Sequence, residues 1–217
     1  MTIDSLYVKF RNLKNNSLGK FRKKKIDKDI TIISNNCWGG LVYQYFDLQY
    51  QSPTIGLFFC PNDYLKFCNN LKYYVNQELK QVLVEDSHNS NFLKEHIKMG
   101  DYKENIIIGK LDDVEIVFLH YNSFQEAKKK WDRRCERINY NHILFKFNNN
   151  NGFKKEDFEK WNALLLKNKV FISDLPEYND KVNTFFVNRS LPNNNGVNDT
   201  TYYDRDINLI SLITSIK

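Results

Sequence analysis

The chain has 217 residues, of which 41% are apolar and 27% are charged, and its formal net charge is +6. This length suits one large domain with its own hydrophobic core, and this composition excludes a wholly disordered chain. No stretch approaches the ~18 consecutive apolar residues that a membrane-spanning helix needs.

Positive charge is concentrated near the N-terminus. Residues 9–28 hold nine basic residues and one acidic residue, a net charge of +8, which leaves −2 for the rest of the chain. The sequence therefore predicts a basic N-terminal arm over residues 1–28, followed by a single near-neutral domain over residues 29–217. Nucleic acid is not an expected partner, because a general nucleic-acid binder spreads positive charge over its folded surface.

The basic arm also has an apolar pattern. Leu6, Phe10 and Leu13 recur at helical spacing, and Gly19 is expected to end this helix. The run Lys23, Lys24 and Lys25 follows. Basic residues beside an apolar stripe favour binding to an anionic membrane surface. The alternative is a solvated helix that packs on the domain.

After the arm, strand and helix patterns alternate along the chain. This alternation predicts an α/β protein with a three-layer α/β/α arrangement and a mainly parallel sheet. Two strands that flank Leu111-Asp112-Asp113 predict at least one antiparallel hairpin. The expected strands are Ile30–Ile33, Thr54–Phe59, Gln81–Val84, Asn105–Lys110, Val114–His120, His142–Phe147, Val170–Ser173 and Thr184–Val187. Helices are expected over 41–46, from Pro61, over 92–97, from Ser123, over 154–166 and over 204–216.

The cysteines argue against a metal or redox site. They stand at positions 37, 60, 68 and 135, and no pair has the C-x-x-C spacing of a zinc ribbon or a thioredoxin motif. His88 and His96 lack supporting acidic or Cys spacing, so no metal site is proposed and no cofactor is indicated. Because no secretory signal precedes the cysteines, we expect reduced thiols in a cytoplasmic protein.

Several distinctive sequence blocks follow one another along the chain. They are Ile32-Ile33-Ser34-Asn35-Asn36-Cys37-Trp38-Gly39-Gly40, Ser52-Pro53-Thr54-Ile55-Gly56-Leu57-Phe58-Phe59, Phe118-Leu119-His120-Tyr121 and Trp131 with Arg133-Arg134. In this order, over about residues 20–175, they are similar to the bacterial domain-of-unknown-function family numbered 1919. Such proteins are often encoded among capsular or exopolysaccharide genes, so the resemblance implies a setting in surface-polysaccharide assembly and supplies no reaction.

The segment 34–40 is the first candidate binding site, because ligands of parallel α/β sheets sit beyond the carboxyl ends of the strands. Amide side chains can pair with sugar hydroxyls, glycines let the backbone approach a ligand, and a Trp can stack on a sugar face. A tight turn with capping side chains and a core Trp explains the same residues. The candidate substrate-binding residues are Ser34, Asn35, Asn36, Trp38, Gly39 and Gly40.

Three further residues are candidates for chemistry. His120 is a candidate general base, a donor to phosphate or an interior histidine. Cys37 could pair with it in acyl transfer or hydrolysis, since a helix N-terminus lowers a thiol pKa, or it could be a small buried residue. Arg134, beside Arg133, could bind a diphosphate or belong to a solvated helix face.

Together these features predict a polysaccharide-biosynthesis protein that binds a glycosyl or glycosyl-phosphate group, as a transferase. It would work in the cytoplasm, at the inner face of the membrane if the arm binds there. The alternative is a non-catalytic accessory module that organises glycosyltransferases. A deep polar pocket around Asn36 and His120 would favour the enzyme, and a filled edge would favour the module.

Overall fold

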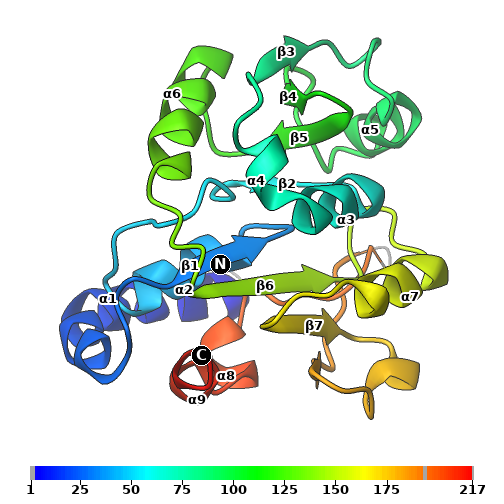
Figure 1. Ribbon diagram of the computed structural model, residues 1–217. Helices are drawn as coiled ribbons and strands as arrows, with labels where there is room; N and C mark the ends of the chain where they lie inside the picture. Colours follow the sequence, from blue (N-terminus) through cyan, green and yellow to red (C-terminus); the bar gives the residue numbers. More distant parts are fainter. Residues whose placement is uncertain (1–2, 193–194, 217) are drawn as a thin grey trace.

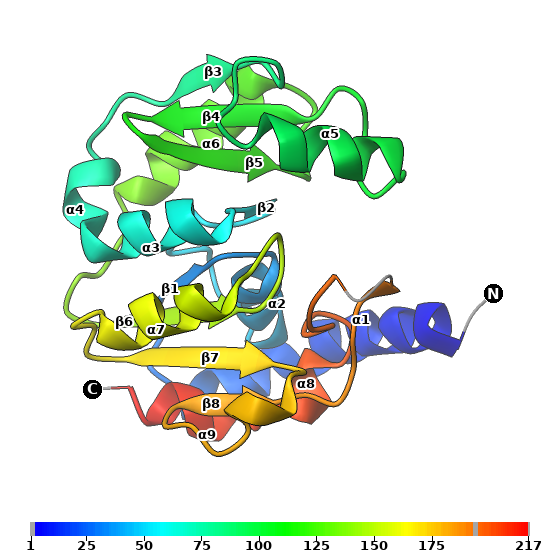
Figure 2. The same cartoon turned by 90° about the vertical axis from the view of Figure 1, so that its right-hand side faces the viewer.

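The computed structural model describes residues 3–192 and 195–216. Helices and strands alternate in this part of the chain (Figures 1 and 2). The helices are α1 Ile3–Arg22, η1 Lys23–Lys25, α2 Trp38–Tyr45, α3 Pro61–Asn69, α4 Leu71–Tyr74, α5 Ser90–Lys98, α6 Phe124–Cys135, α7 Lys155–Ala163, η2 Pro176–Tyr178, α8 Tyr203–Asp206 and α9 Leu209–Thr214. The strands are β1 Thr31–Ser34, β2 Leu57–Phe58, β3 Lys80–Val82, β4 Ile107–Leu111, β5 Val114–Phe118, β6 Ile143–Asn148, β7 Lys169–Ser173 and β8 Thr184–Phe186.

A four-stranded parallel sheet forms the base of the fold, in the order β1-β6-β7-β8. Alternate side chains of β1 enter cores on opposite faces. Ile32 packs with Trp38 of α2 on one face, and Ile33 packs in the core that contains Trp161 of α7 on the other. Burial on both faces explains why these strands read as continuous apolar runs. The predicted α/β class and its layered arrangement are confirmed.

The predicted hairpin is confirmed and belongs to a second sheet. β4 and β5 pair antiparallel, and Asp112 turns the chain with a φ of 55°. This sheet has the order β2-β5-β4-β3 and lies above the parallel sheet, with α3 between them (Figure 2). One apolar core contains Phe147 of the parallel sheet and Ile116 of the antiparallel sheet, so the two sheets share a hydrophobic interior.

Several predicted elements are shorter than expected, and two of them have a clear local cause. The strand expected over Thr54–Phe59 reduces to β2, because Gly56 has a φ of 70° and turns the chain just before it. The helix expected over 204–216 divides into α8 and α9, because Ile207 is extended with φ −130° and ψ 133°. Asn208 then begins α9 anew, since its side chain accepts a hydrogen bond from the Ser211 N–H.

The basic arm is a helix packed on the domain. The prediction that Gly19 ends this helix is wrong, since α1 continues to Arg22. Gly19 instead allows α1 to approach the segment after α2, because a Cβ atom there would lie 2.8 Å from Cβ of Asp47. Residues 1–2 of the predicted arm lie outside the described residues. Among the helices of the described ranges, none has the length and apolar content to cross a bilayer.

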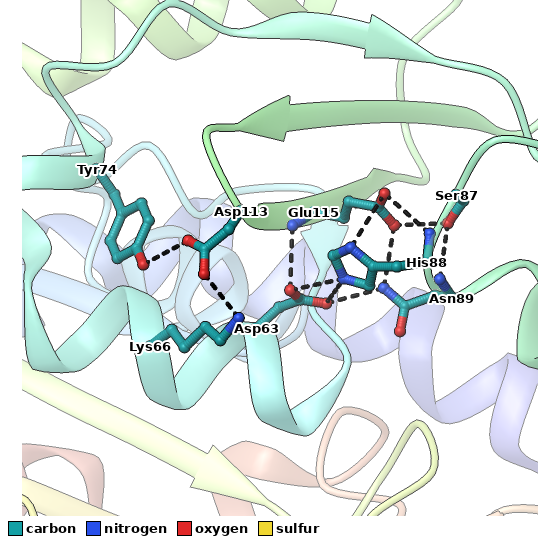
Figure 3. A network of polar contacts seen from close by, with 8 residues as sticks. All are labelled: Asp63, Lys66, Tyr74, Ser87, His88, Asn89, Asp113 and Glu115. Carbon is teal, nitrogen blue, oxygen red and sulfur yellow. Dashed lines mark hydrogen bonds and ion pairs between the residues drawn. The ribbon is translucent and has the colours of Figure 1, made fainter.

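A polar network joins α3 to the antiparallel sheet (Figure 3). Two buried carboxylates, Asp63 of α3 and Glu115 of β5, lie on either side of the partly exposed His88 ring. Nε2 of His88 is 2.9 Å from Asp63 and Nδ1 is 3.3 Å from Glu115. Asn89 donates to both carboxylates, and the Ser87 hydroxyl donates to Glu115. Each buried charge therefore has partners, as burial requires.

This network predicts pH-dependent stability. The hydrogen bond to Asp63 raises the pKa of His88 from its ordinary value of 6.5. The imidazolium therefore stabilises the fold fully below pH 6.5, and this contribution is lost as the pH rises through the higher folded-state pKa. We expect His88→Gln to lower the free energy of urea unfolding more at about pH 5.5 than at about pH 8.5. An equal loss at both pH values would contradict this role.

Candidate functional site

Polar residues gather at the carboxyl edge of the parallel sheet. β1 ends at Ser34, and Asn35 and Asn36 follow it. β6 ends at Asn148 beside them, and Asn35 Nδ2 donates to Asn148 Oδ1 at 2.7 Å. The sequence places these residues here because parallel strands present their carboxyl ends at one edge, where ligands of such sheets bind.

A buried ion pair anchors this edge. Lys146 of β6 and Asp199 are both buried, and the Lys146 ammonium contacts the Asp199 carboxylate. The ammonium also donates to Asn36 Oδ1 at 2.9 Å. Asp199 accepts hydrogen bonds from Nδ2 of Asn36 and of Asn148, both at 2.9 Å. Burial lowers the pKa of Lys146, and the charge of Asp199 partly opposes that shift.

The sequence does not predict this ion pair. Its partners are 53 residues apart, and Asp199 lies in a loop with no periodic pattern. One signal was present: Lys146 interrupts an apolar strand that is buried on both faces, where a charge requires a partner. The pair fixes the loop before α8 to the end of β6. It lies beneath the surface and is closed to ligand in this arrangement.

Some predicted binding residues lie below the surface of the site. Ser34 and Asn35 are fully buried, and their side chains bond to Asn36 and Asn148. Trp38 is also fully buried, in the core under α2, so its ring has no face open for stacking on a sugar. Gly39 packs against β1, where an added Cβ would lie 3.2 Å from Ile32. These four residues support the site from within.

Three predicted binding residues, Asn36, Gly40 and Arg134, and both predicted catalytic residues line cavities. Asn36, Cys37 and His120 line one cavity of about 440 Å³, here called the central cavity. Amide and hydroxyl side chains from Asn150, Asn151, Thr200 and Thr201 complete its polar wall, and Val8 and Arg11 of α1 close one side. Such neutral donors and acceptors match the hydroxyl groups of a sugar.

A second cavity adjoins the central one. This lateral cavity, of about 340 Å³, shares Cys37, Leu41 and His120 with the central cavity and is also lined by Gly40. Two cations lie in its wall, Lys130 and Arg134 of α6. Arg134 Nη1 donates to the Tyr121 hydroxyl at 2.7 Å, and its guanidinium lies 5.1 Å from the centre of the Tyr50 ring. These contacts hold a positive group ready for an anion.

A third cavity extends the site in the other direction. This distal cavity, of about 460 Å³, shares Tyr102, Asn151 and Leu191 with the central cavity. His96 and Asp101 lie in its wall, with His96 Nδ1 2.7 Å from Asp101 Oδ2. The sequence did not indicate this pair, because a spacing of five residues across the end of α5 matches no metal or catalytic motif.

The comparisons with known proteins place the chain in a family. The model of the family described as "Domain of unknown function (DUF1919)" matches residues 8–214. The chain belongs to the DUF1919 family. It is also 29% identical over 155 residues to an "Uncharacterized protein" of Haemophilus influenzae, an alignment that covers 71% of this chain and 66% of that relative. The chain thus spans slightly less than two thirds of the relative's length.

Membership of DUF1919 confirms the resemblance and extends it to residues 8–214, which include most of α1 and all of α9. The family description names no reaction, so the chemistry of the site has to come from its residues. Within the described residues, no three His, Cys, Asp or Glu side chains are arranged to hold a metal ion.

Cys37 lies at the N-terminus of α2, yet its thiol is not activated. Burial and the nearby Asp199 charge raise its pKa to about 11. The expectation that the helix N-terminus lowers this pKa is wrong, because loss of water outweighs the helix dipole. A thiol with this pKa is protonated near neutral pH and is a poor nucleophile. Cys37 therefore forms part of the cavity walls of the DUF1919 site and does not act as a nucleophile.

His120 is the chemically available residue of the site. Its side chain is exposed, and within the described ranges no hydrogen bond to its ring is found. The backbone N–H of His120 donates to the Gly56 carbonyl, which fixes the residue beside the turn before β2. The ring therefore faces both the central and the lateral cavity with its nitrogen atoms unengaged.

Proposed function

We propose that the central and lateral cavities bind a glycosyl-phosphate group. Sugar hydroxyls would pair with Asn151 and the other partly exposed amide and hydroxyl groups of the central cavity, and the phosphate would lie against Lys130 and Arg134. The observation that carries the proposal is the shared wall at Cys37 and His120, which joins a cavity lined in part by amide and hydroxyl groups to a cavity with two cations in its wall. A ligand with a neutral and an anionic half matches that pair of cavities.

We further propose that the protein is a transferase of surface-polysaccharide assembly in the cytoplasm, at the inner face of the membrane. His120 would act as the general base, since it is exposed and lies between the two halves of the proposed ligand. A non-catalytic module that organises glycosyltransferases would bind the same ligand without needing this residue. Replacing His120 with Gln separates the two: a transferase loses turnover and keeps binding, whereas a module binds equally well and shows no turnover before or after the replacement.

The binding proposal predicts a selective loss in an Arg134→Met variant. Glucose 1-phosphate, UDP-glucose and UDP-N-acetylglucosamine are suitable probes, and a ligand that binds the folded state raises Tm. Losing a charge-assisted contact costs about 1.5–3 kcal/mol, so binding should weaken by about 10- to 100-fold. Isothermal titration calorimetry at a temperature below Tm measures the dissociation constant on folded protein. Lys130→Met should have a similar effect.

The control for this experiment is Arg133→Met. Arg133 is the preceding residue of α6, carries the same charge and is exposed outside the lateral cavity. Its variant should bind the probe as tightly as the unchanged protein. The proposal fails if none of the three probes raises Tm, or if Arg133→Met and Arg134→Met weaken binding equally.

A further inference from the structure

The inner face of α1 is polar. Arg11, Asn15 and Arg22 of α1 are buried against the domain. Arg11 Nη1 donates to the Thr200 carbonyl at 3.0 Å, and Asn15 Nδ2 donates to the Tyr203 hydroxyl at 2.9 Å. The Arg22 guanidinium lies 3.7 Å from the centre of the Tyr45 ring, so hydrogen bonds and cation–π contacts dock the helix.

The outer face of α1 is apolar. Phe10, Leu13 and Phe21 are 69%, 67% and 65% exposed, and Leu6 is 42% exposed. At 100° per residue these four side chains fall within one narrow stripe of the helix. The N-terminal part of α1 projects at the edge of the molecule (Figure 2). A soluble helix normally turns such a stripe toward the core, and α1 does the reverse.

Lysines border this stripe on both sides. Lys9 and Lys20 fall on one side and Lys14 on the other, and all three are exposed. Beyond the helix, Lys24 is exposed and its ammonium lies 6.0 Å from the centre of the Phe21 ring. The apolar stripe is therefore enclosed by positive charge, which limits what can cover it.

We propose that the outer face of α1 binds the surface of an anionic lipid bilayer. The helix would lie in the plane of the interface, with Phe10, Leu13 and Phe21 among the acyl chains and the lysines at the headgroups. Each lysine near an anionic surface adds electrostatic attraction to the apolar contact. A second copy of the chain fits poorly, because it would bring two segments of net charge +8 together.

Vesicle sedimentation tests this surface without any cavity ligand, so its outcome is independent of the proposed glycosyl-phosphate site. The unchanged protein should bind vesicles of phosphatidylglycerol and phosphatidylcholine and not vesicles of phosphatidylcholine alone. A variant with Phe10→Ser, Leu13→Ser and Phe21→Ser should bind the anionic vesicles at least tenfold more weakly. Circular dichroism and Tm establish that this variant is folded.

The matched control changes exposed apolar residues elsewhere. Leu165→Ser with Val182→Ser alters two highly exposed side chains outside α1 and should leave vesicle binding unchanged. Equal binding by the triple variant would overturn the proposal, because contact would then be electrostatic alone. Absence of binding by the unchanged protein would overturn it too. So would a dimer in analytical ultracentrifugation that the triple variant abolishes, since a second copy would then cover the stripe.

Discussion

Asp199→Asn is expected to lower the free energy of unfolding by about 3–5 kcal/mol, which is the typical cost of removing one partner of a buried ion pair. Lys146 is fully buried, and Asp199 is the carboxylate in contact with its ammonium. The substitution keeps the size of the side chain and removes the charge, so Lys146 is left in the interior without a counter-charge. Urea unfolding followed by circular dichroism measures the loss.

A double variant shows whether the unpaired charge of Lys146 causes this loss of stability. Lys146→Met together with Asp199→Asn removes both charges, so most of the lost stability should return. Equal destabilisation in the single and double variants would mean that the hydrogen bonds of Asp199 to Asn36 and Asn148, and not the charges, hold this edge. A loss below about 1 kcal/mol in the single variant would contradict the structural role of the pair.

Trp131→Ala is expected to cost about 3–5 kcal/mol, the usual range for removing a large aromatic side chain from a core. Trp131 of α6 is buried, and its ring centre lies 6.0 Å from that of Phe67 of α3 and 6.3 Å from that of Phe118 of β5. Because this core also contains side chains of the parallel sheet, we expect both sheets to unfold in one transition at lower denaturant concentration.

The comparison for this variant is Leu165→Ala, at a fully exposed position, which should change stability by less than about 0.5 kcal/mol. Tryptophan fluorescence of Trp38 and Trp161, which lie on opposite faces of the parallel sheet, should follow the same transition as circular dichroism. Two separate transitions would show that the sheets unfold independently and would contradict the shared core.

The sequence predicted the elements better than their assembly. Apolar periodicity located β1, β6 and β7 and the helices α6 and α7, because these patterns depend on neighbouring residues. Apolar periodicity did not show that the strands form two sheets. The turn at Gly56 brings β2 beside β5, and such pairing of distant strands depends on tertiary contacts, not on neighbouring residues.

The candidate site was predicted in part, for a similar reason. A strand end and a short polar segment indicated Asn36, and the end of the hairpin indicated His120. The depth of each side chain was not predictable, and Ser34, Asn35 and Trp38 proved to be interior. The pairs Lys146–Asp199 and His96–Asp101 depend on how loops return to the sheet. The sequence signals that Lys146 needs a partner without identifying Asp199, and it carries no signal for His96–Asp101.

Helix α1 and the residues after α9 line hollows at opposite ends of the parallel strands, and this affects how the protein can be labelled. Val8 and Arg11 of α1 line the central cavity, whereas Ser215 and Ile216 after α9 line a hollow at the starts of β6 and β7. A fluorescent reporter fused behind α9 therefore leaves the candidate site and the helix surface free. The same reporter fused ahead of α1 would crowd both, so imaging and affinity purification should use the carboxyl-terminal fusion.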